Sequence, residues 1–134
     1  MEENKIEIRQ ISDKEIWVGQ NKLKLGEDGI LYESLVGDLD AGLSLALKTA
    51  AFKLIATAQG VINTLVDLSL TGKPSYEARR IHNKKYNSAA FGKVAYYGAH
   101  PVARVIASFF MAIIDKKNMR YFKIKEDALA WLKE

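Results

Sequence analysis

The sequence of 134 residues contains no cysteine, two prolines and two histidines. The lack of cysteine excludes disulfides, thiolate metal sites and cysteine nucleophiles, and it suits a reducing compartment. The two histidines, His82 and His100, are far apart and stand in no metal-ligand spacing. We therefore expect neither a metal nor a cofactor.

Long hydrophobic runs are also missing. The longest one, Val105 to Ile114, has ten residues, whereas a membrane-spanning helix needs about 20. The first residues, Met1 to Lys5, are acidic and lack the basic and then apolar pattern of an export signal. These features predict a cytoplasmic protein that does not span a membrane.

Charge is unevenly distributed along the chain. Residues 1–40 hold ten acidic and five basic side chains, and residues 41–134 hold six acidic and fifteen basic ones. Because the basic residues fall on several predicted elements and form no single stripe, we interpret them as solvated surface and expect no nucleic acid as a partner. The content of 49% hydrophobic and 27% charged residues is ordinary for one globular domain. We expect a single domain over residues 1–134.

Period-two alternation marks the N-terminal part. Three segments alternate apolar and polar residues: 5–11, then Glu15–Val18 running on to Leu25, then 30–36. Turn signals such as Gly26 to Gly29 separate them. This pattern is typical of antiparallel strands.

Helical spacing alternates with buried strands in the rest of the chain. In chain order the pattern predicts a helix capped by Asp40 and ending near Gly60, a buried strand over 61–68, a loop over 71–74, a helix capped by Ser75 and reaching about Phe91, a strand over 93–97, a helix over 102–114, a strand over 121–125 and a helix over 126–132. The order is β-β-β-α-β-α-β-α-β-α. Such crossovers predict an α/β fold whose mixed sheet has antiparallel N-terminal strands and parallel later ones.

Three local strings, in this order and spacing, resemble the STAS family and in particular its small stand-alone SpoIIAA-like members. They are Gly37–Asp40 before the long helix, Leu65–Ser69 at the end of the buried strand, and the stretch from Gly92 through Pro101–Arg104 to Ala128–Leu132. The resemblance covers roughly residues 5 to 132. It implies a STAS (SpoIIAA-like) fold and a non-catalytic regulatory module that binds a signalling protein, such as an anti-sigma factor.

The resemblance also implies a phosphorylation site at the start of the helix after the central strand. Ser75 is the nearest residue by position and Thr71 the next. Phosphorylated members carry an Asp-Ser-Ser-Gly-like string there, whereas this chain reads Thr-Gly-Lys-Pro-Ser over residues 71–75. Arg79 lies four residues after Ser75, on the same helical face, where a guanidinium can contact a phosphate. The other interpretation of Arg79 is a solvated helix face.

The end of the buried strand collects the candidate site. Because open α/β sheets bind ligands at the carboxyl ends of their parallel strands, we expect a partner at the loop 69–75 and the helix after it. The loop is no P-loop, since Asp67 stands where the first glycine is required. The partner-binding or phospho-acceptor candidates are Asp67, Ser69, Thr71, Lys73, Ser75, Arg79 and His100.

Three alternatives stay open at this point. SpoIIAA-like proteins are also compared with lipid-binding domains, which suggests a carrier or sensor of a small apolar or lipid-like ligand with a cleft near the helix 102–114. Asp67 and His100 with Ser69 or Ser75 have the residue types of a hydrolase, but no Gly-x-Ser-x-Gly elbow is present and we expect no enzyme. An exposed N-terminal edge strand would permit a homodimer.

Overall fold

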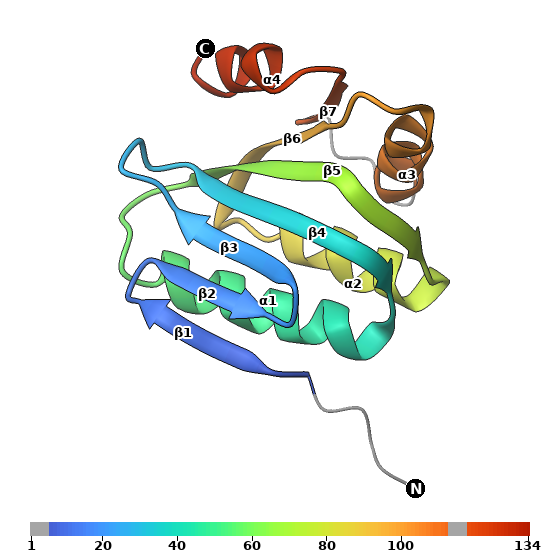
Figure 1. Cartoon of the computed structure of the whole chain (residues 1–134). Helices are drawn as coiled ribbons and strands as arrows, with labels where there is room; N and C mark the ends of the chain where they lie inside the picture. Colours follow the sequence, from blue (N-terminus) through green and yellow to red (C-terminus); the bar gives the residue numbers. More distant parts are fainter. Residues whose placement is uncertain (1–5, 113–117) are drawn as a thin grey trace, which may run out of the picture.

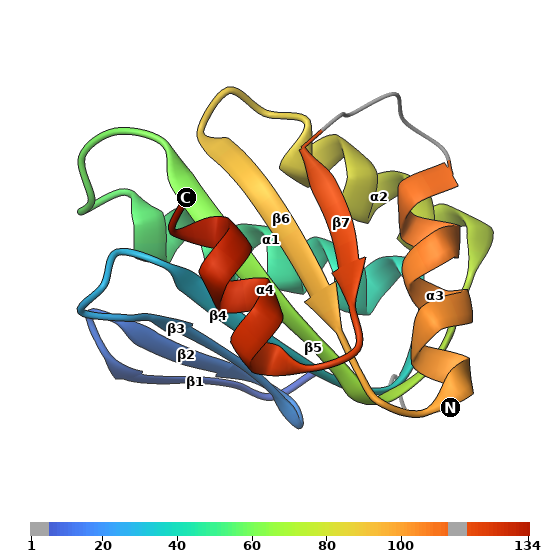
Figure 2. The same cartoon turned by 90° about the horizontal axis from the view of Figure 1, so that it is seen from above.

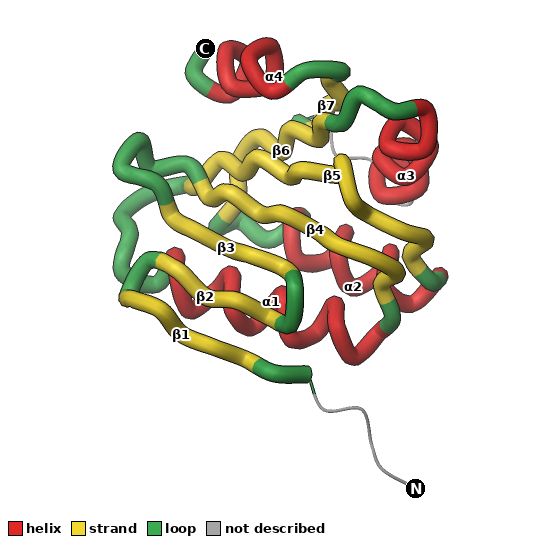
Figure 3. The backbone as a smooth tube through the Cα atoms, viewed as in Figure 1, coloured by secondary structure: helices red, strands yellow, loops and turns green. Residues whose placement is uncertain are grey.

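The computed structural model describes residues 6–112 and 118–134. Over these ranges a seven-stranded sheet is flanked by four helices (Figures 1 and 3). The elements are β1 (Ile8–Ser12), β2 (Glu15–Val18), β3 (Asn21–Leu25), β4 (Leu31–Leu39), α1 (Ala41–Ile55), β5 (Ile62–Pro74), α2 (Tyr76–Tyr86), β6 (Phe91–Tyr97), α3 (Pro101–Ala112), β7 (Met119–Phe122) and α4 (Lys125–Leu132).

The strands lie in the sheet in the order in which they occur in the chain, from β1 to β7. Pairing is antiparallel from β1 to β4 and parallel from β4 to β7. This confirms the predicted mixed sheet with antiparallel N-terminal strands. The order contains one strand more than predicted, because the segment from Glu15 to Leu25 folds back on itself. Gly19 adopts a φ of 59° there, which permits a tight turn between β2 and β3.

Helices cover both faces of the sheet. In Figure 1, α1 and α2 lie below the sheet and α4 lies above it, and Figure 2 shows α3 beside β7. Buried side chains of α1, α2 and α3 join those of the strands in the larger hydrophobic cluster. On the other face, Ala128 and Leu132 of α4 pack with Leu65 and Ala95 in a smaller cluster. We call these the inner face and the outer face of the sheet.

Both predicted helix caps are confirmed. The Asp40 carboxylate accepts the backbone N–H of Leu43 at 2.8 Å, and the Ser75 hydroxyl accepts that of Ala78 at 3.0 Å. Each side chain pairs an amide that the first helical turn leaves free.

Helix and strand ends differ from the prediction. Helix α1 ends at Ile55, short of Gly60, and α2 ends at Tyr86. Phe91 is the first residue of β6, where its ring packs edge-on against Phe52 at 5.5 Å between centroids. Burial of this ring in the sheet core therefore decides against a longer α2. Strand β7 comes two residues earlier than predicted and α4 one residue earlier, while the predicted end of the helix 102–114 lies outside the described residues.

The most consequential difference is the length of β5. The predicted loop over 71–74 is a continuation of the strand, in which Leu70 pairs with Val36, Thr71 with Gly37, and Pro74 with Leu39. The reason is that β4 extends to Leu39, so its last residues offer a parallel partner to the end of β5. Strand β6 pairs with β5 only as far as Asp67. The last part of β5 therefore projects beyond β6, with β4 as its strand neighbour.

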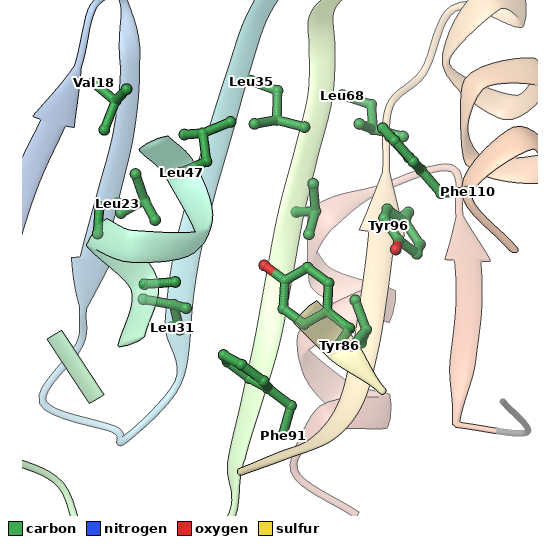
Figure 4. Packing of buried hydrophobic residues seen from close by; sticks show 14 of the residues in the cluster. Val18, Leu23, Leu31, Leu35, Leu47, Leu68, Tyr86, Phe91, Tyr96 and Phe110 are labelled. Atoms are coloured by element: carbon green, nitrogen blue, oxygen red, sulfur yellow. The ribbon is translucent and has the colours of Figure 1, made fainter. Parts of the chain in front are cut away.

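The inner-face core is a mixture of aliphatic and aromatic side chains. Figure 4 shows Leu31 and Leu47 beside β4, Tyr86 and Phe91 at β5, and Tyr96 next to Phe110 of α3. Tyr86 and Tyr96 are both fully buried although each carries a hydroxyl. Such burial requires hydrogen-bond partners inside the core.

Candidate functional site

The end of β5 is fixed to β4 by specific hydrogen bonds. The Asp38 carboxylate accepts the backbone N–H of Lys73 at 2.7 Å. The Ser75 N–H donates to the carbonyl of Leu39 at 2.8 Å. Because a side chain and the main chain of β4 both hold it, the strand delivers the chain into α2 in a defined geometry.

The predicted phospho-acceptors differ in accessibility. Thr71 is 6% exposed, and its hydroxyl donates to the carbonyl of Leu35 at 3.1 Å. Its side chain therefore belongs to the core between β4 and β5. Ser75 is exposed, as are Ser69 and Lys73. Of the two acceptors, Ser75 is the one that solvent reaches.

Arg79 links α2 to α3. Its guanidinium lies 5.6 Å from the centre of the Tyr76 ring and 5.2 Å from that of Phe109, both within the range of cation–π contact. In the part of the chain that the structure describes, the Arg79 side chain forms no hydrogen bond with the unmodified Ser75 hydroxyl. The contact predicted from the sequence was one between Arg79 and a phosphate on Ser75.

Large apolar side chains are exposed around this junction. Leu70 is 71% exposed and Tyr76 57%. On α3, Val102 and Val105 are about half exposed and share one helical face with Phe109. We call Leu70, Lys73, Ser75, Tyr76 and Arg79, together with Val102, Val105 and Phe109, the junction surface.

Asp67 lies apart from the junction surface. It alternates with the core-facing Val66 and Leu68, so it points to the outer face of the sheet. Its carboxylate accepts the N–H of Ser69 at 2.9 Å and is hydrogen-bonded by Tyr97. Burial raises the pKa of Tyr97, and the negative charge of Asp67 is the second cause of this increase.

His100 contacts the backbone and not Asp67. Its Nε2 lies 2.9 Å from the carbonyl oxygen of Ser69, so the tautomer with a proton on Nε2 donates this bond. Over residues 6–112 and 118–134, Asp67 and His100 share no hydrogen bond. Both side chains thus fix Ser69, one at its N–H and one at its carbonyl, and the geometry is not that of a hydrolase pair.

A groove of about 900 Å³ runs along the outer face. Its floor includes Ser34, Leu65 and Asp67. The charged side chains around it are Asp13, Lys14, Glu15, Lys22, Lys24, Glu27, Asp28, Asp67 and Lys125. The Tyr32 hydroxyl donates to Asp28 at 2.5 Å, and burial with this carboxylate raises the pKa of Tyr32 to about 12. The cleft for an apolar ligand was expected near the helix 102–114. This groove lies elsewhere and its walls are charged, which does not suit an apolar ligand.

The structure also contains a buried ion pair that the sequence analysis missed. Glu33 of β4 and Lys85 of α2 are almost fully buried, and the Lys85 ammonium donates to the Glu33 carboxylate at 2.9 Å. The Tyr86 hydroxyl donates to the same carboxylate. Burial lowers the pKa of Lys85, and the Glu33 charge opposes that effect. The sequence contains one indication of this pair. Glu33 is a charged residue at a position that the alternation of β4 directs to the core, between Leu31 and Leu35.

A second buried polar contact joins α2 to β6. His82 Nε2 lies 2.7 Å from the Tyr96 hydroxyl, and the imidazole stacks on Phe110 with 4.0 Å between ring centres. Burial, and to a lesser degree the Lys85 charge, holds the pKa of His82 well below its usual value of 6.5. His82 is therefore neutral in the folded protein at neutral pH.

Metal sites and membrane-spanning helices were also considered in the sequence analysis. Within residues 6–112 and 118–134, no three acidic or histidine side chains gather closely enough to hold a metal ion. Among the described helices, none has the length and apolar character needed to cross a bilayer.

Similarity to solved structures supports the fold. A protein of the DUF3478 family with a SpoIIAA-like fold, from Shewanella loihica PV-4, is 21% identical and superposes with a TM-score of 0.59 over 98% of both chains. The anti-sigma factor antagonist SpoIIAA in its unphosphorylated form is 11% identical, with a TM-score of 0.57 over 84% of this chain and 97% of that one. The predicted SpoIIAA-like fold is thus confirmed.

Sequence comparison gives a narrower assignment. No curated protein matches the chain significantly. The model of a domain of unknown function, DUF7793, matches residues 24–134, which include every strand from β4 to β7 and all four helices. The chain, a mixed α/β protein with a SpoIIAA-like fold, therefore belongs to the DUF7793 family.

Proposed function

We propose that this protein is a non-catalytic regulatory module that binds a signalling protein through the junction surface. The observation that carries the proposal is the exposure of Leu70 and Tyr76 on a rigid strand-to-helix connection. Exposed large side chains on a fixed backbone lose little conformational freedom on binding, and they are the usual anchors of protein interfaces.

Charge around these anchors indicates the chemistry of the partner. Lys73 lies between Leu70 and Tyr76 in the chain. The guanidinium carbons of Arg79 and Arg80 lie within 6 Å of the centre of the Tyr76 ring. An apolar pocket with an acidic rim complements this arrangement. SpoIIAA, which shares the fold, is an anti-sigma factor antagonist. An anti-sigma-like factor or another signalling protein is accordingly the class of partner that we propose.

Asp67, Ser69 and His100 have a supporting role in this proposal. The bonds from Asp67 and His100 to the backbone of Ser69 hold the residue directly before Leu70. We assign the two side chains to positioning the strand end and not to contact with the partner.

Phosphorylation of Ser75 is the proposed regulation. Its hydroxyl caps α2 and is exposed, and a phosphate there would face the free amides of the first helical turn. The added negative charge would oppose an acidic partner rim. Release of the partner on phosphorylation is the expected direction.

The test compares partner capture by three forms of the chain. The pull-down is quantified by mass spectrometry. The variant carrying both Leu70→Asp and Tyr76→Ala should capture about one tenth of the partner that the wild type captures, or less, because it lacks the anchor residues. Val61→Asp is the matched control, since Val61 is 63% exposed at the opposite end of β5.

Two outcomes contradict the proposal. Equal capture by all three forms would move the interface away from the junction surface, and loss of capture with Val61→Asp alone would place it at the other end of the sheet. For the proposed regulation, Ser75→Asp should weaken capture while Ser75→Asn, which keeps a helix cap without the charge, should retain it.

A further inference from the structure

Strand β1 forms an exposed edge of the sheet. All five of its residues are exposed, with Ile8 at 58% and Ile11 at 55%. It pairs with β2 on one side, and Figure 1 shows it as the outermost strand on the N-terminal side of the sheet. Natural proteins usually protect such an edge, because its free backbone groups can pair with another strand.

The hydrogen bonds between β1 and β2 show which backbone groups of β1 remain available to pair with another strand. The Gly19 N–H donates to the Glu7 carbonyl at 2.7 Å, and Arg9 pairs with Trp17 in the same register. In an antiparallel pair, bonded and non-bonded residues alternate, so Glu7 and Arg9 direct their backbone groups to β2. Ile8 and Gln10 therefore direct theirs away from the sheet, to the free edge.

Charge selects one register for a second copy of this strand. An antiparallel pair centred on Ile8 makes Ile8 of one copy bond to Ile8 of the other, which agrees with the outward backbone groups. Glu7 of each copy then lies directly opposite Arg9 of the other, as a non-bonded pair with closely spaced side chains. Both side chains are accessible, at 77% and 52% exposure.

Neighbouring registers are less favourable. Centring the pair on Arg9 places two arginines opposite each other, and centring it on Glu7 places two glutamates opposite each other. Like charges directly opposite destabilise an antiparallel pair. A register centred on Gln10 leaves Arg9 opposite Ile11. Among these registers, only the one centred on Ile8 pairs opposite charges.

We propose that two copies of this chain associate through β1 edges in the register centred on Ile8, which joins two seven-stranded sheets about a two-fold axis. The occupant of the edge is a second copy because the Glu7-to-Arg9 complementarity is self-matching. This interface is separate from the junction surface and does not depend on the function proposed for it.

Charge reversal tests the register. By sedimentation analysis over a range of concentrations, Arg9→Glu and Glu7→Arg should each weaken dimerisation by about tenfold or more, since two cross-strand pairs change from attraction to repulsion. An equimolar mixture of these two variants should dimerise again, because each variant presents the charges that the other lacks. Lys123→Glu, an equal change of charge at an exposed residue between β7 and α4, should leave the dimer unchanged.

A backbone variant tests the edge itself. Ile8→Pro removes an outward N–H without removing a bond to β2, so it should yield a folded monomer. Partner capture by the junction surface should be retained in this variant, and the dimer should be retained in the Leu70→Asp, Tyr76→Ala variant. Each proposal can therefore fail without the other.

Amide hydrogen exchange supplies the residue-level test. Protection of the Ile8 and Gln10 amides should increase with protein concentration, while the Arg9 amide should be protected throughout. A wild-type chain that stays monomeric at all concentrations, or a dimer that survives Ile8→Pro, would overturn the proposal. Protection of these amides only in the presence of a different protein would also overturn it, since the occupant would then be a foreign strand.

Discussion

Glu33 occupies a position in β4 at which the alternation of the strand demands an aliphatic side chain. The structure satisfies its charge with Lys85 and the hydroxyl of Tyr86, both from α2. Such a group costs desolvation energy when it is buried, and the cost is offset only while every partner is present. The ion pair consequently makes the docking of α2 on the sheet dependent on a single geometry.

Removal of one partner should therefore be costly. Lys85→Met should lower the free energy of unfolding by about 3–5 kcal/mol, because it leaves the Glu33 carboxylate buried without its cation. Combining it with Glu33→Gln should cost less than the sum of the two single changes. Chemical denaturation of the four forms measures this coupling. Lys84→Met, at the exposed neighbouring position, should change stability by less than about 0.5 kcal/mol. Additive costs would show that the two side chains act independently.

His82 should make stability depend on pH. Its pKa is lowered in the folded state, whereas in the unfolded chain it is about 6.5. Below that pH the unfolded chain binds a proton that the folded protein excludes, so the free energy of unfolding should fall as the pH decreases from 7 to 5. The added slope is at most about 1.4 kcal/mol per pH unit. His82→Phe should reduce this slope in denaturation experiments at several pH values. An unchanged slope would mean that other groups cause it.

At this scale the sequence predicted local contacts and missed distant ones. Asp40 and Ser75 were predicted as caps because a cap requires only one side chain and the amide three residues later. Glu33 and Lys85 are 52 residues apart, and no periodicity within either segment couples them. The same distinction between local and distant contacts applies to the positions of the candidate site residues. Ser75 is an exposed cap, whereas the hydroxyl of the buried Thr71 bonds to the carbonyl of Leu35 on the neighbouring strand β4.

Among the elements, β4 and β5 define the junction together. Turn-forming residues over 71–74 favoured a loop, but pairing with the end of β4 keeps this segment in the sheet. The length of a strand depends on the length of its partner, which a local pattern does not contain. The expectation for this segment consequently changes from a loop to the end of a paired strand.

Gly72 is the position that permits this close pairing. A Cβ atom at this residue would lie 2.8 Å from the backbone N of Asp38 and 2.8 Å from the backbone carbonyl carbon of Gly37. Gly72→Ala should therefore destabilise the protein, by about 1–3 kcal/mol in thermal denaturation. Gly42→Ala is the matched control. Its Cβ would meet Asp40 at an ordinary 3.6 Å, and alanine in a helix should gain up to about 1 kcal/mol. Equal effects of both changes would exclude a steric role for Gly72.

For the whole molecule, the sequence predicted the fold class, and it predicted as many helices as the described residues contain. Alternating strands and helices restrict the possible topologies strongly. The sequence did not predict where exposed apolar residues gather. The junction surface combines the end of β5, the start of α2 and one face of α3, and these meet only after the sheet has formed. The two surfaces to which we assign binding lie on separate elements, so one copy can engage a partner while its β1 edge engages another copy.

The succession of strands from β1 to β7 has a consequence for how the molecule is assembled. Because each strand's neighbours in the sheet are also the preceding and following strands of the chain, no strand has to be inserted between two that have already paired. Each connection that must be closed therefore joins consecutive strands, and no strand has to pair across an intervening one. A nascent chain leaving the ribosome can therefore add strands one after another at a growing edge, and each strand already in place is the template for the next.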